Sequence, residues 1–110
     1  MSGYLEIARQ ALRRADYHCS TYSALVSRAM QRIDSVCPPG ALRWARQTCP
    51  ALTDRIDVDL FNRLNYLWNA YAPVADFEAA LQELVRAHAE VGRLYREQHG
   101  ISHTLHASEL

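Results

Sequence analysis

Histidine and cysteine are the first side chains of this 110-residue chain to consider for metal binding. His99, His103 and His106 lie close together near the end of the chain, and His18 lies beside Cys19. Their spacing is unlike a metal site, because a glycine interrupts the helix that would align the three histidines. In addition, no cysteine or carboxylate at a fixed offset completes a set of four ligands. We therefore predict no metal ion and no cofactor.

The residue patterns of common enzyme classes are also absent from the sequence. The chain has no Glu-x-x-His pair of the kind that di-iron bundles use, and it has no glycine-rich phosphate loop. Cys19 falls on an apolar helix face, while Cys37 and Cys49 precede prolines, so nothing marks a thiol as an activated nucleophile. Three cysteines without a CxxC pair also argue against a disulfide framework. We predict that the protein is not an enzyme.

Arginine forms the clearest polar pattern, and the chain contains no lysine. The candidate nucleic-acid-binding residues form one stripe on the first predicted helix, which a short second helix extends: Arg14, His18, Arg28, Arg32, Arg43 and Arg46. Guanidinium groups pair well with phosphates, so this stripe would follow the backbone of RNA or DNA without reading its sequence. The alternative is a solvent-exposed face that pairs with the second half of the chain. Residues 1–55 carry a net charge of +4, and residues 56–110 carry −4.

Three aromatic residues are candidate anchors for a partner protein, namely Trp44, Trp68 and Tyr71. Tryptophan and tyrosine dominate the binding energy of many protein interfaces, and Trp68 and Tyr71 flank their apolar stripe instead of lying at its centre. Packing in the core of the protein is the other interpretation of these residues.

The first helix must position most of the residues in the arginine stripe. Apolar residues recur there in alternating steps of three and four: Leu5, Ala8, Leu12, Ala15, Cys19, Tyr22, Val26, Ala29, Ile33 and Val36. This heptad seam predicts one long helix, which ends at residues 37–40 because two prolines and a glycine follow there. Alanine at three d positions favours close antiparallel packing against other helices.

Three further helices follow from the same kind of pattern. Residues 41–48 predict a short connecting helix. Residues 53–72 predict a helix that Thr53 caps, and their aromatic residues mark it as the central element. A last helix begins at Asp76 and ends near Gly100. We therefore expect an all-α fold, an antiparallel helical bundle of three long helices plus one short helix. It forms a single domain (residues 1–100) with a flexible C-terminal tail (residues 101–110).

The first predicted helix is longer than the others. At about 1.5 Å per residue it would measure roughly 50 Å, against about 28 and 36 Å for the third and fourth helices. Either it bends near residues 20–23, or the short helix covers its excess seam, or the excess is left for another chain. The last possibility predicts self-association, or binding of a protein partner, through the first helix.

Hydropathy indicates no membrane-spanning segment in the sequence. The longest stretch without a charged residue is the twelve residues 64–75, whereas a spanning helix needs about 20 mostly apolar residues. The first 14 residues carry charged side chains at regular intervals, unlike a secretory signal. We expect a cytoplasmic protein without a membrane partner.

These observations predict a non-enzymatic helical interaction module or an accessory small subunit of a multi-protein assembly. In general type, the size, helicity and arginine placement resemble the small all-helical subunits of ribonucleoprotein assemblies, including those of CRISPR effector complexes. That resemblance implies the alternative function, which is sequence-independent binding of an RNA or DNA backbone through the arginine stripe.

Overall fold

A computed structural model describes residues 2–100, with the backbone alone at residues 2, 4 and 11–18. The chain is helical throughout this range apart from short connections, and the range contains no strand. The elements in chain order are α1 (Ser2–Val36), α2 (Ala41–Thr48), α3 (Pro50–Asp54), the π-helical segment η1 (Arg55–Leu60), α4 (Phe61–Asn69) and α5 (Val74–Gln98). The all-α prediction is confirmed, and the predicted flexible tail lies outside the described residues.

The connection between α1 and α2 lies where the two prolines predict it. The first helix ends at Val36, and the second begins at Ala41. Gly40 precedes α2 with a φ of +84°, a left-handed conformation that glycine adopts without the steric cost of a Cβ. The predicted end of the first helix and the predicted short helix are therefore confirmed.

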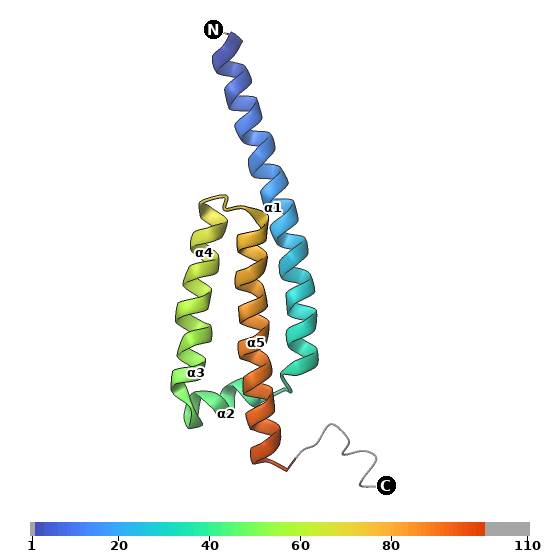
Figure 1. The fold of residues 1–110 in the computed structure, drawn as a ribbon, viewed down its shortest axis with the longest axis vertical. Coiled ribbons are helices and arrows are strands. Elements are labelled where there is room, and N and C mark those ends of the chain that lie inside the picture. Colours follow the sequence, from blue (N-terminus) through green and yellow to red (C-terminus); the bar gives the residue numbers. More distant parts are fainter. Residues whose placement is uncertain (1, 101–110) are drawn as a thin grey trace.

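The next helical stretch begins earlier than predicted. Pro50 is the first residue of α3, a position where its missing N–H is no loss. Thr53 lies one turn further on and is buried, and its hydroxyl donates to the Pro50 carbonyl oxygen at 3.0 Å. The prediction that Thr53 caps this helix is therefore wrong. The residues that join α3, η1 and α4 keep right-handed helical backbone angles, and the three segments form one column (Figure 1).

The last helix also begins before its predicted cap. Pro73 takes the N-cap position of α5, and Asp76 lies in the first turn. The predicted cap at Asp76 is wrong, but a carboxylate in the first turn still interacts favourably with the positive end of the helix dipole. At the other end His99 is the C-cap, and Gly100 follows with a φ of +69°. This agrees with the prediction that the last helix ends near Gly100.

The central helix of the fold is α5, with α1 on one side and the α3–η1–α4 column on the other (Figure 1). The first and last helices run in the same direction. Tyr22 stacks on Phe77 near one end, and the Arg96 guanidinium donates to the Val36 carbonyl oxygen at 3.2 Å near the other. The antiparallel arrangement therefore holds for α4 with α5, but not for α1 with α5. The reason is that α2 carries the chain past α5 before the chain turns back.

Two apolar clusters hold these helices together, and α5 contributes to both. The first joins α1 to α5 and contains Tyr22, Leu25, Ala29, Ile33, Phe77, Leu81 and Val85. The second joins α2 and η1 to α5 and contains Ala41, Ala45, Ile56, Leu60, Ala87 and Val91. The prediction that residues 53–72 form the central element is wrong, since α5 lies between α1 and α4 and contributes to both clusters.

The resulting layer of helices is thin. The molecule measures 72 × 29 × 18 Å. Its smallest dimension is less than the thickness of two stacked helices, because a single helix with its side chains is about 10–12 Å across. Both α1 and α4 pack against α5, but they hardly contact each other. A layer of this kind leaves the space between its two outer helices uncovered on at least one face.

The first part of α1 projects beyond the other helices (Figure 1). Tyr22 is the first residue of α1 that the structure shows as fully buried, and we name residues 2–18 of α1 the arm. Leu5, on the seam of the arm, is 58% exposed. The short helix α2 lies near the opposite end of α1 and does not cover this seam. No helix of the described residues is long and apolar enough to cross a membrane.

Candidate functional site

Three aromatic rings from three helices meet near one end of the layer. The Tyr22 ring of α1 lies 4.1 Å from the Phe77 ring of α5 and 5.2 Å from the Trp68 ring of α4, measured between ring centroids. Trp68 also lies edge-on to Phe77, at 5.8 Å. The Tyr22 hydroxyl donates to the carbonyl oxygen of Ala72 in the turn between α4 and α5, and burial raises the pKa of this hydroxyl. These contacts tie α1 to both other helices at this end.

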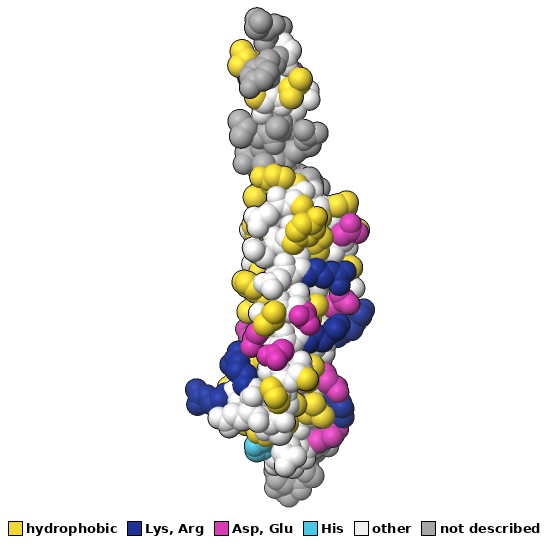
Figure 2. All heavy atoms as spheres, turned by 90° about the vertical axis from the view of Figure 1, so that its left-hand side faces the viewer, with side chains coloured by type: hydrophobic (Ala, Val, Ile, Leu, Met, Phe, Trp, Pro, Cys, Tyr) yellow, Lys and Arg dark blue, Asp and Glu magenta, His cyan; other side chains and the backbone are white. Residues whose placement is uncertain are grey.

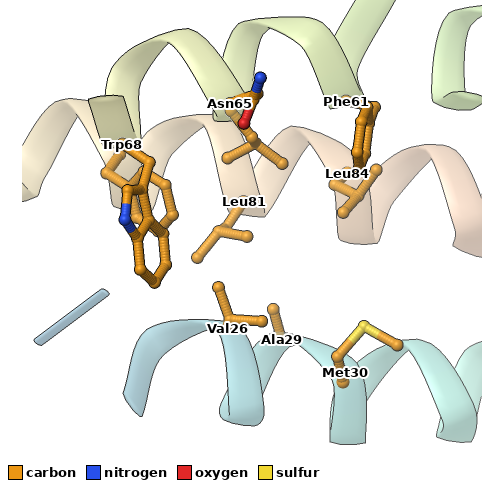
Figure 3. A pocket seen from close by; sticks show the side chains of 10 residues that line it. Val26, Ala29, Met30, Phe61, Asn65, Trp68, Leu81 and Leu84 are labelled. Carbon is orange, nitrogen blue, oxygen red and sulfur yellow. The ribbon is translucent and has the colours of Figure 1, made fainter. Parts of the chain in front are cut away.

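An apolar groove begins at this aromatic cluster and runs between α1 and α4 (Figure 3). Its floor is α5 and its walls are the two outer helices. The hollow has a volume of about 290 Å³. The lining residues are Val26, Ala29 and Met30 of α1, Phe61, Leu64, Asn65 and Trp68 of α4, and Phe77, Leu81 and Leu84 of α5.

The groove continues along α5 past the end of this first hollow. A second hollow of about 290 Å³ shares Phe61, Leu64 and Leu84 with the first, and it extends to Asp57 and His88. The two hollows together follow α5 from Phe77 to His88, a length of about 16 Å at 1.5 Å per residue. We name this combined feature the groove. Its length is that of about three helical turns.

Large apolar side chains at the rim of the groove are exposed to solvent. Phe61 is 63% exposed and Met30 is 48% exposed, and they face each other from opposite walls in Figure 3. Exposed apolar residues of this size at a concave surface are typical of sites that bind other molecules. The groove is therefore a candidate site for apolar side chains of a partner.

Few polar groups line the groove. The Asp57 carboxylate accepts a hydrogen bond from Arg46 Nε of α2 at 3.2 Å. His88 is buried, and its Nδ1 lies 2.8 Å from the Leu84 carbonyl oxygen of the preceding turn. Asn65 is the remaining polar side chain of the lining. Neither cysteine nor serine lines the groove, and most of its lining side chains are apolar.

The arginines of the predicted stripe lie on two separate elements. Arg28 and Arg32 are exposed on α1 and line another hollow, which is on the side of the α1–α5 contact away from the groove. Glu78 of α5 lies in the same hollow. Arg43 and Arg46 are exposed on α2, where Arg46 pairs with the carboxylate of η1 described above. The side chains of two further candidates, Arg14 and His18, lie outside the described residues.

The three aromatic candidates for partner binding are not brought together. Trp68 lines the groove, as described above. Trp44 of α2 is half-buried near the other end of α5, where its ring lies 5.6 Å from that of Tyr95. Tyr71 is 52% exposed in the turn after α4, with a φ of +52°. Only Trp68 therefore contributes to the groove.

Sequence reasoning missed Met30 and Phe61 as residues of a site. The available signal for Phe61 is the breadth of the apolar stripe on the helix predicted over residues 53–72. Leu60 and Phe61 are consecutive and point to different sides, so this stretch of helix has apolar residues on more than one face. Leu60 is buried against α5, and Phe61 faces the groove.

The remaining candidates for metal or thiol chemistry form no cluster in the described part of the chain. Among the side chains that the structure describes, no group of three potential ligands could hold a metal ion. His99 Nδ1 lies 2.9 Å from the Tyr95 carbonyl oxygen, whereas His103 and His106 lie outside the described residues. The three cysteines are free thiols.

Charged side chains on the outer surface of the layer lie near groups of opposite sign. On the face that α4 presents in Figure 2, acidic and basic side chains lie side by side, with hydrophobic side chains in between. Glu83 of α5 pairs with Arg63 of α4 at 2.6 Å and with Arg55 of η1 at 3.9 Å. The Arg55–Glu83 pair connects the two halves of the chain, which differ in net charge, whereas Arg63 and Glu83 both belong to the second half.

Comparison with known proteins does not identify a relative of this chain. No family model, curated protein or solved structure matches it.

Proposed function

We propose that this protein is a non-enzymatic helical interaction module, of the kind that serves as an accessory subunit in an assembly, and that its groove binds an amphipathic helix of a partner. The observation that supports this proposal is the apolar groove between α1 and α4, with the exposed side chains of Met30 and Phe61 at its rim. Recognition of a helix in an apolar groove is a common mode of protein binding.

The arrangement of the three helices makes a helix the best-fitting ligand. Since α1 and α4 flank α5 and contact each other mainly through Tyr22 and Trp68 at one end of the groove, a fourth helix laid over α5 would contact all three and complete a four-helix arrangement. Packed helix axes lie about 8–10 Å apart, which is the distance at which side chains of such a helix would enter the groove. Because the groove is about three helical turns long, these side chains would come from three successive turns. Each Leu-sized side chain buried there would contribute about 1.5–3 kcal/mol.

Contact with a nucleic-acid backbone is the second candidate function. Arg28 and Arg32 lie one turn apart on α1 and are exposed, which supports contact with phosphates. Glu78 lies beside them, and Arg46 is paired with Asp57, so the positive potential of the stripe is reduced. We therefore place this function second to helix binding.

Site-specific photocrosslinking in the full chain tests the proposed function. Benzoylphenylalanine at position 61 would lie at the rim of the groove, and the same group at position 66 gives a matched control, because Tyr66 is exposed on α4 and does not line the groove. We expect position 61 to link to the apolar face of an amphipathic helix, and Met30→Glu to reduce this product several-fold.

Equal crosslinking from positions 61 and 66, or products that map to segments without an apolar helical face, would overturn the proposed function. The result is read from the linked peptides by mass spectrometry. Nonspecific capture of abundant proteins thus does not count as support.

A further inference from the structure

Two apolar residues on the seam of the arm are exposed to solvent. Leu5 is 58% exposed, and Ala8 is exposed on the same seam. The heptad pattern continues through Leu12 and Ala15 toward Tyr22, where the buried part of α1 begins. The arm itself projects beyond the other helices of the fold (Figure 1). An amphipathic helix with an uncovered seam is the type of ligand that the groove fits.

We infer that the helix bound in the groove is the arm of a second copy of this chain, in a dimer in which each arm occupies the groove of the other copy. This inference rests on the proposed function, since it names the partner of the same groove. The groove runs alongside the second half of α1, and the arm is the first half of the same helix. A two-fold axis across α1 near the end of the arm would reverse the second copy and fill both grooves at once.

The lengths of the two parts support this arrangement. Residues 2–18 in a helix measure about 25 Å. The wall formed by residues 50–69 measures about 30 Å at the same rise, and the groove beside it measures about 16 Å. The arm is thus long enough to fill the groove, and it does not extend beyond the wall.

The residue types of the arm also fit a close antiparallel contact. Ala8 and Ala15 occupy d positions, where small side chains let a neighbouring helix approach closely, and Leu5 and Leu12 at a positions would enter the groove. Three arginines and two acids give the arm a net charge of +1. The α3–η1 part of the opposing wall (residues 50–60) has three aspartates and one arginine, a net charge of −2. The two surfaces are therefore weakly complementary in charge.

Sedimentation of the full chain and of four variants tests the inference. We expect wild type to sediment at twice its monomer mass of 12.5 kDa. The arm variant Leu5→Glu/Leu12→Glu and the groove variant Phe61→Glu should each raise the dimer dissociation constant by about tenfold or more, because a charge would enter an apolar contact. Matched controls are Ile7→Glu, off the seam of the arm, and Tyr66→Glu, off the groove. Both controls should remain dimeric, and circular dichroism should show unchanged helicity in all variants.

Crosslinking in the purified protein identifies the contact directly. Benzoylphenylalanine at position 61 should link to residues within the arm of a second copy and give a product of twice the monomer mass. A monomeric wild type, or a dimer that neither the arm variant nor the groove variant weakens, would overturn the inference. If position 61 then links instead to an amphipathic helix of a different protein, the proposed function still stands. Equal crosslinking from positions 61 and 66 would overturn both the dimer inference and the proposed function.

Discussion

Cys37, at the end of α1, has a thiol whose reactivity follows from its surroundings. Its side chain is half-buried and packs against both apolar clusters. Burial raises the pKa of this thiol, as does the nearby Asp34 carboxylate, whereas the Arg96 guanidinium opposes the shift. The thiolate is the reactive form, so a raised pKa leaves less of it at neutral pH.

We therefore expect iodoacetamide to alkylate Cys37 more slowly in the folded protein than in concentrated urea at the same pH. The rate should rise as the pH increases toward a midpoint above the ordinary value of a cysteine thiol, because the folded state favours the neutral form. Mass spectrometry of the peptide that contains Cys37, sampled over time at several pH values, measures this rate. Equally fast alkylation in buffer and in urea at neutral pH would contradict the expected shift.

At the scale of single residues, the sequence predicted the ends of helices better than their N-caps. The prolines after Val36 and Gly100 after α5 mark helix ends, because missing donors and positive φ values are local properties. Thr53 and Asp76 were wrong as caps, since Pro50 and Pro73 set earlier starts. Of the groove residues, Trp68 was a predicted partner contact. Met30 and Phe61 were not, because their position depends on which helices become neighbours.

Gly92 determines how closely two elements approach, since it lies where the end of α1 meets α5. A methyl group at this position would overlap with the Val36 carbonyl oxygen and would lie 3.2 Å from Arg96 Nη1. The same carbonyl oxygen accepts a hydrogen bond from Arg96. Glycine therefore allows the backbone of α1 to lie against α5 while an arginine satisfies one of the last carbonyl groups of α1.

Gly92→Ala should destabilise the protein by about 1–3 kcal/mol, because the added Cβ forces α1 away from α5. This sign is opposite to the usual effect inside a helix, where alanine is about 1 kcal/mol more stable than glycine. Urea denaturation followed by circular dichroism measures the free energy of unfolding. Gly3→Ala in α1 is the control. A Cβ added at Gly3 would meet nothing within 4 Å, so this substitution should be neutral or slightly stabilising. A stabilised Gly92→Ala variant would show that α1 does not lie this close to α5.

At the scale of elements, periodicity predicted the long first helix and the short second one with nearly their observed bounds. It did not predict the π-helical turn of η1 or the parallel direction of α1 and α5. Both depend on tertiary contacts. The segment η1 places Ile56 and Leu60 into the second apolar cluster. The path of α2 past α5 determines the side of α5 on which the following column packs. The aromatic content of α4 was also misleading, because Phe61 and Trp68 line an open groove and Tyr66 is exposed, so these rings do not form a closed core.

For the whole molecule, the arrangement of three helices accounts for both the groove and the arm. The excess length of the first helix was predicted from element lengths, and three explanations were open. The structure excludes cover by α2, which lies near the other end of α1, and Leu5 on the seam of the arm is exposed. Apolar surface on both the groove and the arm is the feature that sequence alone could not place, because it requires knowing that α1 and α4 do not close over α5.

This arrangement predicts that the stability of the wild type depends on protein concentration, since arm and groove would bury apolar surface only in the dimer. The melting temperature should rise as the protein is concentrated, because association stabilises the folded state by mass action. Removal of residues 2–18 should abolish this dependence and leave the melting temperature near that of dilute wild type, since the buried contacts of α1 begin at Tyr22. Differential scanning calorimetry over a wide concentration range measures both quantities. A truncated protein that melts far below dilute wild type would instead show that the arm stabilises its own chain.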